Sequence, residues 1–196
     1  MSKLLISLLA AAGLMFAGAA GAVGEKTTMS RDAYKAEKDK IEAQYKTDKQ
    51  KCDGLNGNAK DVCQAEAKGH EKVAKAELEA NYKNTDKARY DARVAKADAD
   101  YDVAKEKCDD LKGNDKDVCV KEAKATHTKA KADAKVARAQ REETVKTSNK
   151  VSDAKRDAAE DKRDADYKVA KEKCDALSGA AKDKCQADAK ARYGKT

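Results

Sequence analysis

Residues 45–63 read YKTDKQKCDGLNGNAKDVC, and the same pattern returns as YDVAKEKCDDLKGNDKDVC at 101–119 and YKVAKEKCDALSGAAKDKC at 167–185. Each copy has a tyrosine, a cysteine seven residues later, ten further residues and a second cysteine. A pattern that recurs along a chain at this scale is typical of one supersecondary unit used several times. The repeat therefore predicts the architecture of the protein, and it is not a catalytic signature.

A glycine stands between the two cysteines of every copy, five residues after the first, and predicts a reversal between two helices. We expect it to end the first helix in the left-handed conformation, at Gly57, Gly113 and Gly179. Asn58 and Asn114 follow as candidate N-caps of the second helix. A leucine of each copy is expected to cover the turn, and an aspartate to lie in the opening turn of the second helix, where its charge suits the helix dipole. These residues are Leu55, Leu111 and Leu177, and Asp61, Asp117 and Asp183.

Residues 1–22 have the features of a secretory signal peptide. Lys3 precedes an apolar run from Leu4 to Phe16, and Ala20 and Ala22 fit the small residues required before a cut after position 22. The apolar run is shorter than the ~20 residues that span a bilayer. We therefore expect cleavage, no transmembrane segment in the remaining chain, and a periplasmic or secreted protein.

The six cysteines predict three disulfides, because exported proteins fold in an oxidising compartment. Six cysteines allow many pairings in principle, but the repeat favours the local ones. Two antiparallel helices on either side of the turn would present the two cysteines of one copy to each other at the same height. The expected bridges are Cys52–Cys63, Cys108–Cys119 and Cys174–Cys185.

The chain has few residues that could fill a large core. It is 40% charged, with a formal net charge of +7, and contains no proline or tryptophan. After residue 22 its large aliphatic side chains are one isoleucine, four leucines and eleven valines, fewer than globular domains usually hold. Ala, Lys, Glu and Arg, which dominate the composition, are strong helix formers. We expect an all-α protein of long antiparallel helices, joined by three disulfide-stapled hairpins around a thin, alanine-rich core.

Small and apolar residues between positions 90 and 137 recur at alternating spacings of four and three, as in the a/d seam of a coiled coil. The predicted seam contains Tyr90, Val94, Ala97, Tyr101, Ala104, Cys108 and Leu111, and then Cys119, Ala123, Thr126, Ala130 and Ala137. Alanines allow helices to approach closely but bury little area, so the packing alone is weak. The disulfides are expected to compensate for that weakness.

After the signal peptide, residues 23–196 are expected to form a single elongated helical domain with hairpins at about 30–83, 86–146 and 150–194. Two chain paths fit the pattern. In one, residues 81–86 and 147–152 break the helices and leave three hairpins with shorter arms. In the other, which we favour slightly because proline is absent, helices run unbroken from hairpin to hairpin as rods of well over ~60 Å.

The usual sites of chemistry find little support. His70 and His127 follow the second cysteines of two copies, but Arg192 and Tyr193 take the matching place in the third, so no metal ligand set is repeated. We interpret both histidines as solvent-facing. The cysteines lack the two-residue spacing of thiol redox enzymes, and no Ser, His and Asp set suggests itself. The sequence predicts a protein that is not an enzyme and needs no cofactor.

A basic stretch runs from Lys124 to Arg141, KATHTKAKADAKVARAQR, with Asp133 as its single acidic residue. Such a stretch can bind phosphates by releasing counterions. Expected export argues against nucleic acid, and anionic envelope components are the more plausible partner. A solvated helix that binds no ligand is the favoured interpretation, and self-association through the alanine seam is a further alternative.

Segments such as AKEKCDALSG followed by AKDKC at 170–185 resemble exported Ala/Lys-rich proteins of Gram-negative bacteria, often labelled cell-envelope or TolA-like. TolA proteins are similar in having a long Ala/Lys/Glu-rich periplasmic helix, but they also keep a membrane anchor and a globular C-terminal domain. The resemblance implies a structural or stress-protective role in the envelope. The alternative is a holdase-like chaperone whose basic arms resemble those of Skp, or an anion-binding module.

Overall fold

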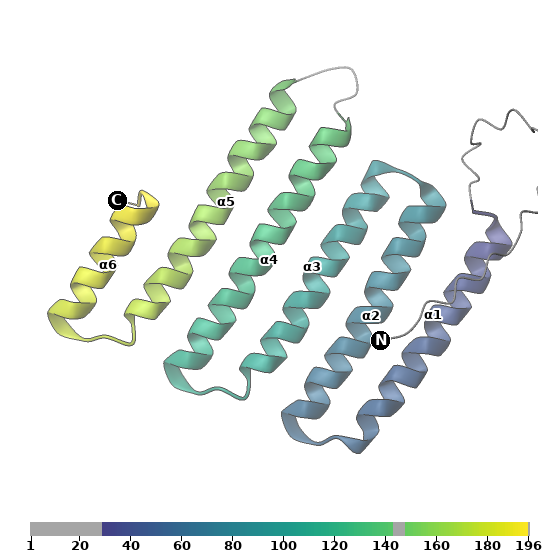
Figure 1. Ribbon diagram of the computed structural model, residues 1–196, viewed down its shortest axis with the longest axis horizontal. Helices are drawn as coiled ribbons and strands as arrows, with labels where there is room; N and C mark the ends of the chain where they lie inside the picture. Colours follow the sequence, from purple (N-terminus) through teal and green to yellow (C-terminus); the bar gives the residue numbers. More distant parts are fainter. Residues whose placement is uncertain (1–28, 143–147, 196) are drawn as a thin grey trace, which may run out of the picture.

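The structure, a computed structural model, describes residues 29–142 and 148–195, and the predicted signal peptide lies outside these ranges. The described residues form six α-helices and one short 3-10 turn and contain no strand (Figure 1). Their bounds are α1 Arg31–Lys51, η1 Cys52–Gly54, α2 Gly57–Lys83, α3 Asp86–Cys108, α4 Gly113–Glu142, α5 Ser148–Cys174 and α6 Gly179–Tyr193. None of these helices has an apolar stretch long enough to cross a bilayer.

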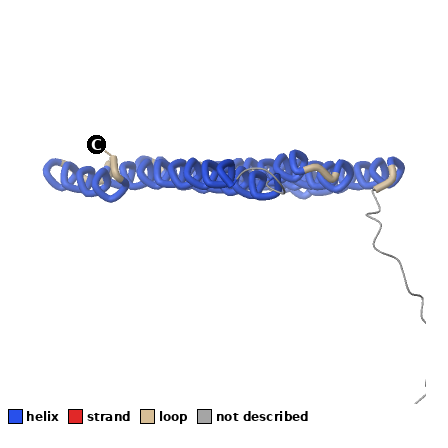
Figure 2. Tube along the Cα trace, turned by 90° about the horizontal axis from the view of Figure 1, so that it is seen from above, coloured by secondary structure: helices blue, strands red, loops and turns tan. Residues whose placement is uncertain are grey.

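The helices lie side by side in one flat layer that is a single helix thick, as the edge-on view in Figure 2 shows. Within the described ranges, each helix packs only against the helices that precede and follow it in the chain. The three cysteine-bearing turns lie along one edge of the layer, the lower edge in Figure 1. The predicted all-α architecture of antiparallel, disulfide-stapled hairpins is confirmed, and the helices form an open row.

At residues 81–86 the slightly favoured prediction of an unbroken helix was wrong. At the second junction, residues 143–147 lie outside the described residues, and residues 148–152, where a break was also considered, belong to α5. The helix that leaves the first cysteine turn ends at Asn84, whose φ of 50° places it in the left-handed region. The side chain of Thr85 then accepts a hydrogen bond from the backbone N–H of Ala88 and caps α3. Asparagine tolerates the left-handed conformation and threonine is a good N-cap, so these two residues reverse the chain without a proline. The helices therefore have between 15 and 30 residues, and the longest is roughly 45 Å.

An inner helix of a flat layer needs two packing seams, one for each neighbour, and α3 shows both. One side of α3 carries the predicted seam and meets α4 through Tyr101 and Cys108. The opposite side carries a second seam, spaced by four and three, that faces α2 and was missed in the sequence. It consists of Ala88, Ala92, Ala95 and Ala99, all buried.

The predicted seam fails in part on α4, because that helix is also packed on both sides. Thr126 and Ala130, which were expected to face the partner helix, are exposed. The buried residues of α4 are Ala123, Ala125, Ala132 and Ala134. Ala123 and Ala134 lie along one side of the helix, and Ala125 and Ala132 lie along another side. A single coiled-coil seam therefore does not describe the packing.

Candidate functional site

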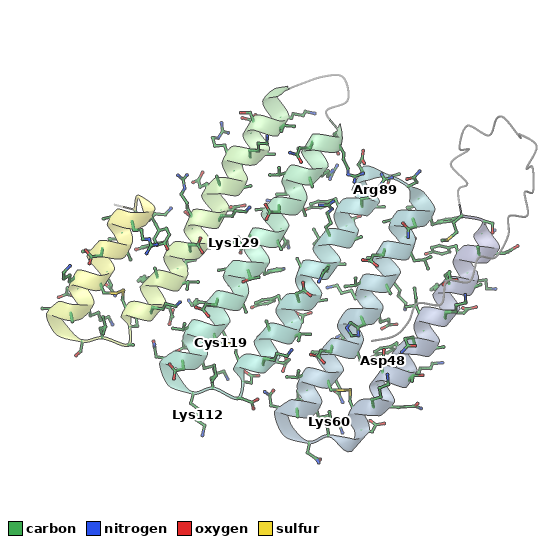
Figure 3. The ribbon with its side chains drawn as sticks, in the orientation of Figure 1. Asp48, Lys60, Arg89, Lys112, Cys119 and Lys129 are labelled. Carbon is green, nitrogen blue, oxygen red and sulfur yellow. A yellow bond between two sulfur atoms is a disulfide. The ribbon has the colours of Figure 1, made fainter. Side chains whose placement is uncertain are left out.

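The three disulfides join the predicted cysteines, and each bridge links the end of one helix to the second turn of the next. The Cα atoms are 5.6 Å apart in Cys52–Cys63 and 5.7 Å apart in Cys108–Cys119 and Cys174–Cys185. The first cysteine of every pair is buried. Figure 3 shows Cys119 near the turn at which α4 begins. The bridges thus hold three equivalent hairpins along one edge of the layer.

The turn glycines adopt the left-handed conformation that we expected, but they lie at a different place in the turn. Gly57, Gly113 and Gly179 have φ values of 56°, 55° and 55°. Each is the first residue of the second helix and does not end the first one. In the first turn, η1 ends at Gly54, and Leu55 and Asn56 then run extended before Gly57. The prediction of a glycine C-cap was therefore wrong in position and right in backbone conformation.

Three smaller expectations about the turns also need correction. Asn58 and Asn114 lie inside α2 and α4, so they are not N-caps. Asp61, Asp117 and Asp183 are each the fifth residue of their helix, just beyond the first turn. The leucines do not cover the turns: they are the exposed large hydrophobic residues of the layer, with exposed fractions of 38%, 42% and 44% for Leu55, Leu111 and Leu177.

The two histidines differ in their surroundings. His70 is exposed on α2, as predicted. His127 is half-buried, stacks on Tyr101 with ring centroids 4.9 Å apart and lies 2.7 Å from a carboxylate oxygen of Asp98 through Nε2. The equivalent pair in the next hairpin is Tyr167 and Tyr193, with centroids 6.4 Å apart. In these two hairpins the position therefore holds an aromatic ring that packs on the repeat tyrosine, whereas the first hairpin has Glu71 there. The prediction of a solvent-facing side chain was wrong for His127.

Asp98 connects three helices through its carboxylate. It lies on α3, accepts a hydrogen bond from Lys72 on α2 at 3.3 Å, and pairs with His127 and Lys131 on α4. Partial burial raises the pKa of Asp98, but the hydrogen bonds from His127 and Lys72 and the charges of Lys72 and Lys131 outweigh it and leave the pKa below its ordinary value. The ionised carboxylate therefore stabilises the packing of α2, α3 and α4.

Most of the basic stretch that begins at Lys124 is neutralised by carboxylates within the layer. Lys129, which lies on the side of α4 that faces α5 (Figure 3), pairs with Asp166. Further ion pairs join Lys131 to Asp98, Lys135 to Asp161 and Arg138 to Glu142. The sequence shows a run of positive charge, but folding brings carboxylates of α3 and α5 next to three of its lysines. Anion binding by this stretch therefore loses much of its electrostatic basis.

An open groove of about 590 Å3 lies between α2 and α3. Val73 and Val103 contribute apolar surface to it, and the ion pair between Glu66 and Lys107 crosses it with a distance of 3.0 Å. An equivalent groove of about 530 Å3 lies between α4 and α5, where Lys129 takes the place of Val73. The groove between α2 and α3 is thus the more apolar of the two, although charged side chains also line it.

Among the residues that the structure describes, no three His, Cys, Asp or Glu side chains are grouped so that they could hold a metal ion. All cysteines in these ranges are bridged. Comparison of the chain with protein family models, with curated proteins and with solved structures gave no match. Evidence on function therefore comes from the layer, its turns and its grooves.

Proposed function

We propose that the protein is an exported, non-enzymatic helical protein with a structural role in the envelope of a Gram-negative bacterium, where it serves as a flat, hydrophilic spacer. The observation that carries the proposal is the single layer of helices, which leaves both broad faces open and places three disulfides along one edge (Figures 1 and 2). Such a shape exposes more surface than a compact bundle of the same chain and encloses little interior volume.

The stabilising interactions fit an oxidising compartment outside the cytoplasm. The core consists mainly of alanines, which bury little area per residue, so covalent links contribute a large share of the stability. Ion pairs also join neighbouring helices, including Lys173–Glu122 at 2.6 Å and Lys75–Glu42 at 3.3 Å. Charged faces keep such a layer hydrated, as a protectant against envelope stress would require.

Export and oxidation can be tested together in a Gram-negative host that produces the whole chain. The expected result is a periplasmic protein that starts at Val23 and whose non-reducing peptide map shows the three local disulfides. A matched Leu9→Arg variant, which interrupts the apolar run, should stay in the cytoplasm with alkylatable thiols. A wild-type chain that keeps its N-terminus and free thiols in the cytoplasm would contradict the proposal.

The structural role needs a separate measurement in the source bacterium. A strain that lacks the protein should lose viability under osmotic, oxidative or metal stress, and the wild-type chain should restore it. A variant with all six cysteines changed to alanine should not restore it if the folded layer is what matters. A deletion strain that behaves like the parent under all three stresses would count against the role.

A holdase-like chaperone is the second candidate, because three exposed leucines lie at the turns along one edge of the layer. Apolar side chains arranged in this way can contact an unfolded client, and the groove between α2 and α3 adds further apolar surface. Excess protein should then suppress aggregation of a client diluted from urea. The variant with Leu55, Leu111 and Leu177 changed to serine should suppress it less; equal suppression by both proteins would exclude the leucine edge as the binding surface.

A further inference from the structure

The two terminal helices each have an outer side against which no described residue packs. Helix α1 packs only against η1 and α2, and α6 packs only against α5. They lie at opposite ends of the row in Figure 1. By the cysteine spacing, α1 is the counterpart of α3 and α5, and α6 is the counterpart of α2 and α4. The outer sides of α1 and α6 therefore correspond to the two halves of an interface that the chain already forms twice, between α2 and α3 and between α4 and α5.

The small residues at the closest approach of this interface are also present on the terminal helices. Between α2 and α3, a Cβ added to Gly69 would come within 3.2 Å of the Ala99 side chain. Between α4 and α5, the equivalent positions are Ala125 and Ala165, and both are buried. The repeat places Ala191 at this position on α6 and Ala43 at the complementary position on α1. Both of these alanines are exposed.

The charged residues at the interface also have counterparts on the terminal helices. Lys107 of α3 pairs with Glu66 of α2 at 3.0 Å, and Lys173 of α5 pairs with Glu122 of α4 at 2.6 Å. Their counterparts on the terminal helices are Lys51 on α1 and Asp188 on α6, which again have opposite charge.

Lacking each other, these two residues pair within their own helices. Lys51 bonds Asp48 at 2.7 Å and Asp188 bonds Lys184 at 3.0 Å. Such intrahelical pairs contribute only about 0.3–0.5 kcal/mol, so they are readily exchanged for a partner on another chain.

We propose that α6 of one copy docks along the C-terminal half of α1 of a second copy, so that the layer continues from chain to chain. Ala191 then meets Ala43, and Asp188 meets Lys51, as their counterparts do inside the chain. The contact is head-to-tail, and without ring closure it generates linear assemblies. It is a property of the oxidised, purified chain and does not depend on export or on an envelope role.

The assembly is expected to be weak, because α6 has 15 residues whereas α2 and α4 have 27 and 30. Its contact covers only the part of α1 from about Ala43 to Lys51. The buried area therefore falls below the roughly 1,200 Å2 of a stable interface. Association should appear only at high protein concentration or when the chain is confined.

The first test is sedimentation of the oxidised protein over a wide concentration range, together with zero-length carbodiimide crosslinking and mass spectrometry. The expected result is a mass that rises with concentration and a crosslink between Lys51 and Asp188. That crosslink must join two copies, because α1 and α6 lie at opposite ends of one layer. A protein that remains monomeric at every concentration, or that associates without this crosslink, would overturn the proposal.

The second test uses charge reversal. Asp188→Lys and Lys51→Asp should each abolish association, and mixing the two variants should restore it, because each then meets a complementary charge. Asp102→Lys is the matched control: it makes the same change in charge at an exposed position of α3, an inner helix that is packed by α2 and α4 and takes no part in the proposed contact. Loss of association with Asp102→Lys but not with Asp188→Lys would place the contact elsewhere and refute the head-to-tail arrangement. Unchanged helical circular dichroism would show that all the variants fold.

Discussion

Removal of the Cys174–Cys185 disulfide is expected to release α6 from the layer and leave the rest folded. α6 is the shortest helix, with 15 residues, and among the described elements it contacts only α5. Isolated helices of this length are marginal in water. Beyond the disulfide, few side chains hold α6: Tyr193 contacts the ring of Tyr167, Lys182 pairs with Asp175 at 2.9 Å, and Ala189 is buried. Lys195, just after the helix, pairs with Asp164. The double variant Cys174→Ala/Cys185→Ala tests this prediction without leaving a buried thiol.

The magnitude follows from the length of the closed loop. The two cysteines are 11 residues apart in sequence. The chain-entropy model assigns about 2.8 kcal/mol at 25 °C to closing a loop of this size. Since every 1.4 kcal/mol is a factor of ten, opening of α6 should become up to roughly 100-fold more frequent.

Hydrogen exchange followed by mass spectrometry can measure this change peptide by peptide. Amides of α6 should exchange up to roughly 100-fold faster in the double variant, whereas those of α2, α3 and α4 should keep their protection. The matched control is Cys108→Ala/Cys119→Ala, which removes the same size of loop. There, α3 and α4 each keep a second neighbour, so local exchange should rise far less. Equal increases in exchange rate after the two disulfides are removed, or no increase in α6, would refute the idea that the number of neighbouring helices governs local stability in this layer.

Three further predictions concern charge, packing and the exposed edge. Because the pKa of Asp98 is lowered, its contribution to stability is present above about pH 4 and is lost as the pH falls through the lowered pKa. Asp98→Asn should therefore reduce the free energy of unfolding at pH 7 and make the remaining stability less sensitive to acid. Urea unfolding at a series of pH values measures both effects. Gly69→Val should destabilise the protein by about 1–3 kcal/mol through overpacking against Ala99. Gly69→Ala should cost much less, because alanines occupy the equivalent positions 125 and 165 between α4 and α5. A Gly69→Val variant as stable as wild type would contradict the close approach of α2 and α3. Changing any one of the exposed turn leucines Leu55, Leu111 and Leu177 to serine should shift the unfolding free energy by less than about 0.5 kcal/mol, and a larger loss would show that the turn depends on the leucine.

The hairpins and their disulfides could be predicted because the information that determines them is local. A glycine between two cysteines at constant spacing demands a reversal, and a reversal of that length brings the cysteines together whatever surrounds them. Even so, the prediction that the turn glycine ends the first helix was wrong. Gly57 opens α2, because the first helix ends earlier, in a 3-10 turn followed by extended Leu55 and Asn56. Left-handed geometry is encoded in the glycine, but the helix boundary depends on the whole turn.

The second alanine seam could have been found from the sequence, since Ala88, Ala92, Ala95 and Ala99 have regular heptad spacing. It was missed because a single seam suffices for a hairpin, and the second is needed only if the hairpins pack in a row. The reversal at Asn84 and Thr85 falls within residues 81–86, where one of the two predicted chain paths placed a break. The unbroken path was slightly favoured because both residues are compatible with a helix, and the local caps, αL Asn84 and N-cap Thr85, show that it was the wrong choice there.

By itself, the sequence determined the helical content, the three hairpins and the pairing of the cysteines, because propensity, glycine conformation and spacing act within a few residues. Only the tertiary structure decided that the hairpins form an open layer, that His127 packs on Tyr101, and that carboxylates of α3 and α5 pair with lysines of the basic stretch. Alanine seams and Lys/Asp pairs fit many alternative helix neighbours almost equally well. Which neighbour is chosen depends on the sum of many weak contacts across the layer, and no single segment of this chain contains that information.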